Sequence, residues 1–149
     1  MASSMAAKIH GAEAIIGHTF ANQLLLWEAL QAAGSPVHMV GTRRLDNGNK
    51  RLAVLGDTVL QLALVEDWYE GNTPRGHYDS IRQQVASNVN LSSVCRQSGL
   101  DACINRSPSQ MGHVSPITTC ATVEAVLGAV YLDSDMNSVK RVMITLGLT

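Results

Sequence analysis

The sequence predicts an all-α domain, and three features support this fold class. Two stretches, residues 49–64 and 119–133, would be apolar almost all the way round if they were helices, which is the pattern of buried helices. Three others, residues 19–33, 78–98 and 135–146, repeat apolar residues at helical spacing. The 149 residues, 46% of them apolar, suffice for a hydrophobic core. We therefore expect residues 1–149 to form a single helical domain.

The first predicted helix covers residues 19–33. Thr19 is a suitable N-cap and Phe20 a suitable hydrophobic staple. One face carries apolar residues at regular spacing, namely Leu24, Trp27 and Leu30. Residues 37–49 are rich in turn formers and lack periodicity, so we expect a loop there, with Asn49 as the N-cap of the next helix.

The stretch 49–64 carries one acid, Asp57, in an otherwise apolar helix. A carboxylate removed from water is costly unless a cation, a metal or several donors meet it, so this position indicates a site. Gly56 lies beside it. Because glycine within a helix costs about 1 kcal/mol relative to alanine, we expect another helix to pass close by.

The stretch 119–133 repeats this pattern, with one acid, Glu124, and one glycine, Gly128. Two such helices could cross and bring Asp57 near Glu124. The residues alone leave a second interpretation open, in which each acid is capped by a neighbouring side chain or reaches the surface at a helix edge.

The rest of the chain reads as helices and loops. Residues 78–98 form an amphipathic pattern that could break near Ser87, and Gly99 fits a C-terminal cap. Residues 105–116 are polar and contain proline, which predicts an exposed loop whose His113 is solvated. Residues 135–146 predict a last amphipathic helix.

The formal net charge of −1 and the pI of about 6.5 are unusual for a protein that holds nucleic acid unaided. Basic pairs occur at residues 43–44, 50–51 and 140–141, and each is compatible with a solvated helix end.

Neither a disulfide framework nor a zinc site is indicated, because the three cysteines form no CxxC pair and have no histidine at metal spacing. Cys95 and Cys120 are expected in the core. No signal-peptide pattern and no run of about 20 apolar residues is present, so we expect an intracellular protein without membrane partners, in cytoplasm, nucleus or mitochondrion.

Residues 49–60, NKRLAVLGDTVL, resemble the ribonuclease III family signature N-E-R-L-E-F-L-G-D-S-V-L. Residues 121–133, ATVEAVLGAVYLD, are similar to the second acidic motif of that family, D-A-F-E-A-L-I-G-A-I-Y-L-D. The linking segment 76–91 matches at several positions, and the resemblance covers about residues 15–146 in the family's order.

The resemblance implies a helical nuclease domain that pairs as a homodimer, takes double-stranded RNA and holds Mg²⁺ with four carboxylates per subunit. Mapped onto this chain, the first pair is Ala53 with Asp57 and the second is Ala121 with Glu124. Each pair thus retains one acid, so Asp57 and Glu124 are the expected catalytic and metal-binding remnant. The dimer contact maps to Val54 and Leu55, where the family has phenylalanine at position 54.

Because methyl groups offer Mg²⁺ no ligand, we expect metal binding to be weak or absent and cleavage to be lost or severely reduced. The domain would then act in RNA binding or assembly; no residue is assigned to RNA binding. No second, double-stranded RNA-binding domain is recognisable in the 149 residues.

Two alternatives remain. The first is an active Mg²⁺-dependent nuclease, either using substitute ligands such as Glu66, Asp67 or Asp79, or seen with alanines introduced to silence it. The second is a structural subunit of a ribonucleoprotein such as a mitochondrial ribosome.

Overall fold

The computed structural model describes residues 4–149 and confirms the all-α class. The α-helices of the described residues are α1 Met5–Ile16, α2 Gln23–Ala29, α3 Lys50–Glu70, α4 Arg75–Ala86, α5 Asn88–Ser98, α6 Pro116–Asp133 and α7 Met136–Leu146. A short 3-10 helix, η1, covers Leu100–Cys103, and the strands β1 Met39–Val40 and β2 Arg43–Arg44 form an antiparallel hairpin. No helix in residues 4–149 combines the length and the apolar character that a membrane span requires.

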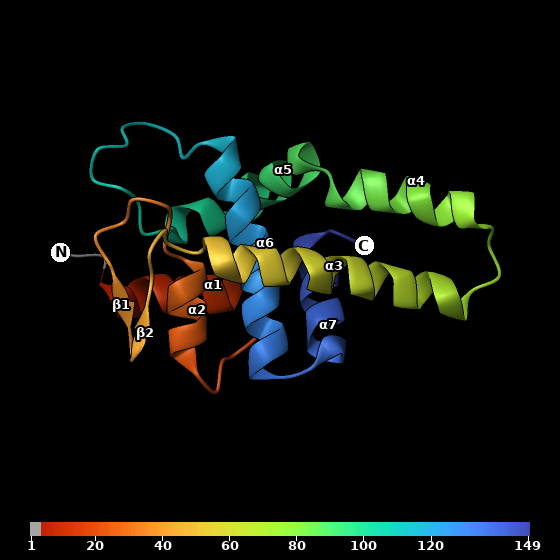
Figure 1. Ribbon diagram of the computed structural model, residues 1–149, viewed down its shortest axis with the longest axis horizontal. Coiled ribbons are helices and arrows are strands. Elements are labelled where there is room, and N and C mark those ends of the chain that lie inside the picture. The colour runs from red at the N-terminus through yellow and green to blue at the C-terminus, as the bar shows by residue number, and fades with distance from the viewer. Residues whose placement is uncertain (1–3) are drawn as a thin grey trace.

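Helix α6 is the centre of the fold (Figure 1), where it crosses behind α3 and packs against α2, α5 and α7 as well. The middle of α6, from Val123 to Val130, is buried apart from Glu124, as expected of a helix that is apolar almost all round there. The hydrophobic core therefore surrounds the second of the two apolar stretches.

The C-terminal half of α3 and the whole of α4 form an arm that projects from the body of the domain (Figure 1). No residue of α4 is fully buried. It rests on α3 through half-buried apolar side chains and through the aromatic pair Trp68 and Tyr78, whose ring centroids lie 5.7 Å apart. The arm is thus held by one face of an amphipathic helix.

The first predicted helix is shorter than expected, and Thr19 does not cap it. The Asn22 side chain is the N-cap and accepts from the Leu24 N–H. The chain before Asn22 is held by acids from other helices: Asp133 accepts from the N–H groups of Ala21 and Asn22. At the other end, α2 stops at Ala29 because the following backbone pairs with Asn105 instead.

Three further features differ from the sequence predictions. Helix α1 was not anticipated, and residues 37–49, expected to be an irregular loop, contain the hairpin of β1 and β2. Asn49 stands at the start of α3, but its side chain makes no capping hydrogen bond. Its amide instead donates to the carbonyl oxygen of Ala29 and to Thr122 Oγ1, at 2.7 and 3.2 Å, and so joins three helices.

Other predicted features are confirmed. The amphipathic segment breaks at Ser87, which caps α5, and Gly99 ends α5 with a left-handed φ of 84°. His113 lies exposed in the loop before α6, and residues 136–146 form α7. Cys95 and Cys120 are buried free thiols.

Candidate functional site

The two motif helices cross at their glycines. A Cβ on Gly56 would overlap the backbone carbonyl of Glu124, and a Cβ on Gly128 would lie 2.9 Å from the Leu52 carbonyl oxygen. Only residues without side chains allow this approach, so the expectation that the glycines admit a second helix is confirmed. The crossing sets Asp57 of α3 against Glu124 of α6.

Asp57 and Glu124 form a hydrogen-bonded carboxyl pair. Burial, followed by the hydrogen bond to Asp57 and the negative charge of Asp57, raises the pKa of Glu124 to about 8. Gln61 Nε2 donates to both carboxylate oxygens of Asp57, at 3.2 Å each. Glu124 therefore keeps its proton at neutral pH.

The two alanines lie beside this pair. Ala53 is buried and Ala121 half-buried, and both line a pocket into which Glu124 also opens. A carboxylate at either position would stand next to the remaining acids, as the four-acid pattern requires. The methyl groups leave apolar walls there instead.

The proposed substitute ligands lie elsewhere. Lys140 Nζ contacts Glu66 and Asp67, at 3.0 Å each, between α7 and the C-terminal half of α3. Glu66 is nine residues from Asp57, which is about 13 Å along a helix. Asp79 belongs to α4 of the projecting arm. In residues 4–149, no three His, Cys, Asp or Glu side chains are grouped so that they could hold a metal ion.

The donor set matches only half of the magnesium site that the resemblance implies. Mg²⁺ binds near-octahedrally through carboxylate oxygens and water. Here, two carboxyl groups stand where the family pattern has four, Glu124 keeps its proton near neutral pH, and the Gln61 amide donates to both oxygens of Asp57.

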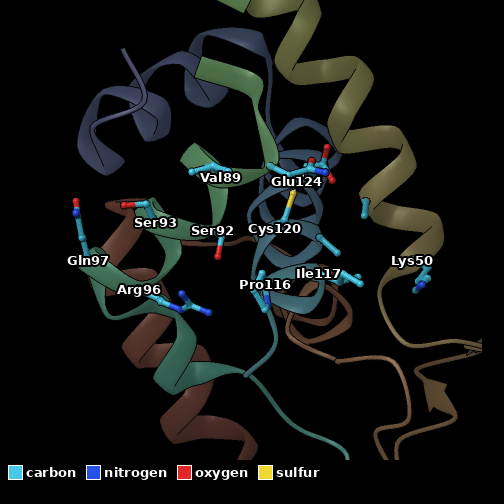
Figure 2. A pocket seen from close by; sticks show the side chains of 13 residues that line it. Lys50, Val89, Ser92, Ser93, Arg96, Gln97, Pro116, Ile117, Cys120 and Glu124 are labelled. Atoms are coloured by element: carbon cyan, nitrogen blue, oxygen red, sulfur yellow. Dashed lines mark hydrogen bonds between the residues drawn. The ribbon is translucent and has the colours of Figure 1, made fainter. Parts of the chain in front are cut away.

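The pocket beside the carboxyl pair has a volume of about 840 Å³ (Figure 2), and no sequence pattern predicts it. Its walls come from α3, α5 and α6, which lie far apart in the chain. Cys120 contributes a thiol that donates to Asn88 Oδ1 at 3.3 Å. Burial, then the nearby Glu124 and Asp57, raises the pKa of this thiol to about 11, so it stays protonated and unreactive.

Of the two residues predicted to contact a second subunit, Val54 lies on the side of α3 that faces away from the core, and Leu55 packs partly against the core. Val54 is 71% exposed and Leu55 is half-buried. The outer face of α3 continues along the helix with Thr58, Leu62, Val65 and Tyr69. An apolar helix face of this length is typical of an interaction surface.

The basic pairs differ in their surroundings. Arg43 is paired with Glu28 and Arg44 with Asp46, while Lys140 forms salt bridges with Glu66 and Asp67 of α3. Lys50 and Arg51, at the start of α3, are exposed, and neither forms a salt bridge within residues 4–149.

Comparisons with known proteins agree with this geometry. The Ribonuclease III domain model matches residues 50–135. Ribonuclease 3 of Idiomarina loihiensis is 28% identical over 138 residues, which cover 89% of this chain and 56% of that protein. Ribonuclease 3 of Caenorhabditis briggsae is 33% identical over 131 residues, or 85% of this chain and 12% of that protein. The chain thus spans little more than half of the first relative and a small part of the second.

Two solved structures share the fold, both of the nuclease domain of ribonuclease III from Campylobacter jejuni. One has a TM-score of 0.78 at 22% identity, covering 93% of this chain and 94% of that one, and is described as having a flexible region involved in dimer formation. The other has a TM-score of 0.75 at 20% identity, with 93% and 92% covered. Since the domain model matches more than half of the residues, this chain belongs to the ribonuclease III domain family.

Proposed function

We propose that this domain binds double-stranded RNA as a homodimer and has lost most or all of the ability to cleave it. The observation that carries the proposal is the pair of alanines, Ala53 and Ala121, that line the pocket beside Asp57 and Glu124.

Metal-assisted hydrolysis of a phosphodiester needs oxygen ligands that hold the ion, offset the charge developing on the phosphate and lower the pKa of the attacking water. Four carboxylates would supply up to four negative charges, whereas two carboxyl groups remain here and Glu124 keeps its proton near neutrality. Loading Mg²⁺ would also have to displace this proton and the Gln61 amide. Each displacement lowers the affinity of the site for Mg²⁺ further.

Homodimer formation is supported by the apolar outer face of α3. Soluble oligomers most often pair around a two-fold axis, which brings the same surface of both copies together. Val54 lies at one end of this face, and a valine there fills less space than the phenylalanine of the family signature. We therefore expect a weaker dimer than a phenylalanine would give.

The cleavage test uses the purified chain and long double-stranded RNA, with Mg²⁺ or Mn²⁺, read on a denaturing gel. The expected result is intact RNA together with a salt-sensitive band shift in a parallel binding assay. Efficient cutting that Asp57→Asn abolishes would refute the loss of catalysis.

The dimer test is light scattering after size-exclusion chromatography, with 15.9 kDa as the mass of one copy. Val54→Asp should shift the chain toward the monomer, and Val54→Phe toward the dimer. Ile144→Asp on α7, a matched change at another exposed apolar residue, should leave the mass unchanged. A chain that is monomeric with either Val or Phe at position 54 would contradict the proposed interface.

A further inference from the structure

Helix α5 lines the pocket beside the carboxyl pair with two rows of side chains (Figure 2). Within each row the residues are four positions apart, so they lie on one face of the helix, about 6 Å from one another along its axis. The first row is Asn88, Ser92 and Arg96, and the second row is Val89, Ser93 and Gln97.

The first row is used by the fold. Its side chains bond, in chain order, to the Cys120 thiol, the Thr119 hydroxyl and the Val114 carbonyl oxygen, at 3.3, 2.8 and 3.4 Å. These contacts fix α5 against α6 and against the segment that precedes α6. Arg96 is nevertheless exposed and keeps further N–H donors for a ligand.

The second row has no such role. Within residues 4–149, neither the Ser93 hydroxyl nor the Gln97 amide makes a hydrogen bond, although every polar side chain of the first row does. Gln97 is exposed, Ser93 is half-buried, and Val89 is 84% exposed. The second row therefore presents neutral donors and acceptors to the pocket that no other part of the described chain uses.

The cations of the pocket lie beside this row. Figure 2 shows Lys50 and Arg96 on opposite sides of Pro116 and Ile117. Neither cation forms a salt bridge in the part of the chain that the structure describes. Both are suited to phosphates, but phosphate contacts position a nucleic acid without distinguishing RNA from DNA. That distinction needs a group that reads the sugar.

The chemistry of the second row suits the ribose. An RNA duplex has a deep, narrow major groove that side chains do not read and a shallow minor groove that displays its 2′-hydroxyls. A 2′-hydroxyl both donates and accepts a hydrogen bond, and so do a serine hydroxyl and a glutamine amide. Val89, at the end of the row, offers an apolar contact to the carbon atoms of a sugar.

We infer that the second row of α5 reads ribose 2′-hydroxyls in the minor groove of double-stranded RNA. Ser93 and Gln97 are then the residues that distinguish RNA from a duplex without these hydroxyls, while Lys50 and Arg96 hold the phosphates of either. Recognition of the ribose in this way rests on the proposed binding of double-stranded RNA, and it needs neither a metal ion nor cleavage.

The test compares two fluorescent duplexes of one sequence and about 20 base pairs, RNA and 2′-fluoro RNA, which keeps the A-form shape but lacks the hydroxyl. Fluorescence anisotropy with EDTA present measures their affinity for the whole chain, so that neither metal nor cutting contributes. The unaltered chain should bind the RNA duplex roughly tenfold or more tightly than the 2′-fluoro duplex, because two hydrogen bonds are lost.

Two double variants separate the reading of the sugar from the holding of phosphate. Ser93→Ala with Gln97→Leu should weaken RNA binding roughly tenfold, to the affinity of the 2′-fluoro duplex, and leave the salt dependence unchanged. Lys50→Ala with Arg96→Ala should instead weaken both duplexes and lower the salt slope by about 2.

The matched control is Ser80→Ala with Gln84→Leu, which makes the same changes at the same spacing on exposed residues of α4. It should leave both affinities unchanged. Circular dichroism checks the fold of each variant.

Three results would overturn the role of the second row and leave the proposed RNA binding standing. The first is equal affinity of the unaltered chain for the two duplexes. The second is a preference for RNA that Ser93→Ala with Gln97→Leu retains, and the third is a preference that the α4 control also loses. An unaltered chain that binds neither duplex would refute the proposed function itself, and the role of the second row with it.

Discussion

Replacing Gly56 by alanine tests the helix crossing on which the site depends. A Cβ at this position would overlap the carbonyl oxygen and carbon of Glu124, which are backbone atoms of a buried helix and cannot rotate away. Helices α3 and α6 would have to separate. Because Asp57 and Glu124 sit at the crossing, the same movement would pull the carboxyl pair apart.

The sign of the change in stability distinguishes this close crossing from the ordinary preference of helices for alanine over glycine. In an exposed helix, alanine is better than glycine by about 1 kcal/mol. Overpacking a core typically costs about 1–3 kcal/mol and sometimes more. Gly128→Ala, with its nearest atom at 2.9 Å, should fall in that range. Gly56→Ala should lose more than about 3 kcal/mol, or roughly 10 °C in Tm for a chain of this size.

Urea unfolding followed by circular dichroism measures both losses. Gly76→Ala is the matched control, since Gly76 lies in α4 with nothing within 4 Å of the added Cβ, and it should stabilise the protein slightly. If Gly56→Ala were as stable as Gly76→Ala, the close crossing would be refuted. If Gly56→Ala fails to fold, Gly128→Ala still provides a measurable loss.

Two further predictions concern pH. Since the pKa of Glu124 is raised from 4.5 to about 8, the folded state keeps a proton that the unfolded chain releases, so stability should fall as pH rises through that window. Glu124→Gln removes this decline: its Tm should exceed that of the unaltered chain by several degrees near pH 8, with a smaller difference near pH 5. Equal pH profiles would disprove the raised pKa of Glu124. The pKa of Asp133 is shifted in the opposite direction, below its usual value. Burial alone would raise the pKa of Asp133, but hydrogen bonds from the Asn22 N–H, from His18 and from the Ala21 N–H lower it. The stability it provides is present above about pH 4 and lost below. Asp133→Asn should cost about 2 kcal/mol at pH 7 and little near pH 3, measured by urea unfolding at both values.

The sequence was most informative at residues that are unfavourable in their local helix and therefore indicate a contact with another element. Asp57 and Glu124 are isolated acids in apolar helices, and glycine at positions 56 and 128 weakens a helix unless another approaches it. These four residues predicted the crossing and the pairing of the acids, both of which the structure shows. The break near Ser87 was also expected from the sequence, and the structure shows that the Ser87 side chain caps α5 there.

What the sequence could not provide depends on contacts between distant residues. Thr19 looked like the cap of α2, but Asp133, more than a hundred residues away, holds the backbone before Asn22. The sequence suggested Asn49 as the N-cap of α3, but its side-chain amide donates to the Ala29 carbonyl oxygen and to Thr122 Oγ1 instead. The pocket combines the starts of three helices, so no local pattern marks it.

The most direct measurement of the central claim is cleavage of long double-stranded RNA by the double variant Ala53→Glu with Ala121→Asp, beside the unaltered chain. This variant replaces two methyl groups by carboxylates next to Asp57 and Glu124. With Mg²⁺, we predict cutting by the double variant and none, or a trace, by the unaltered chain. Efficient cutting by the unaltered chain would show that the two remaining carboxyl groups suffice, which contradicts the account.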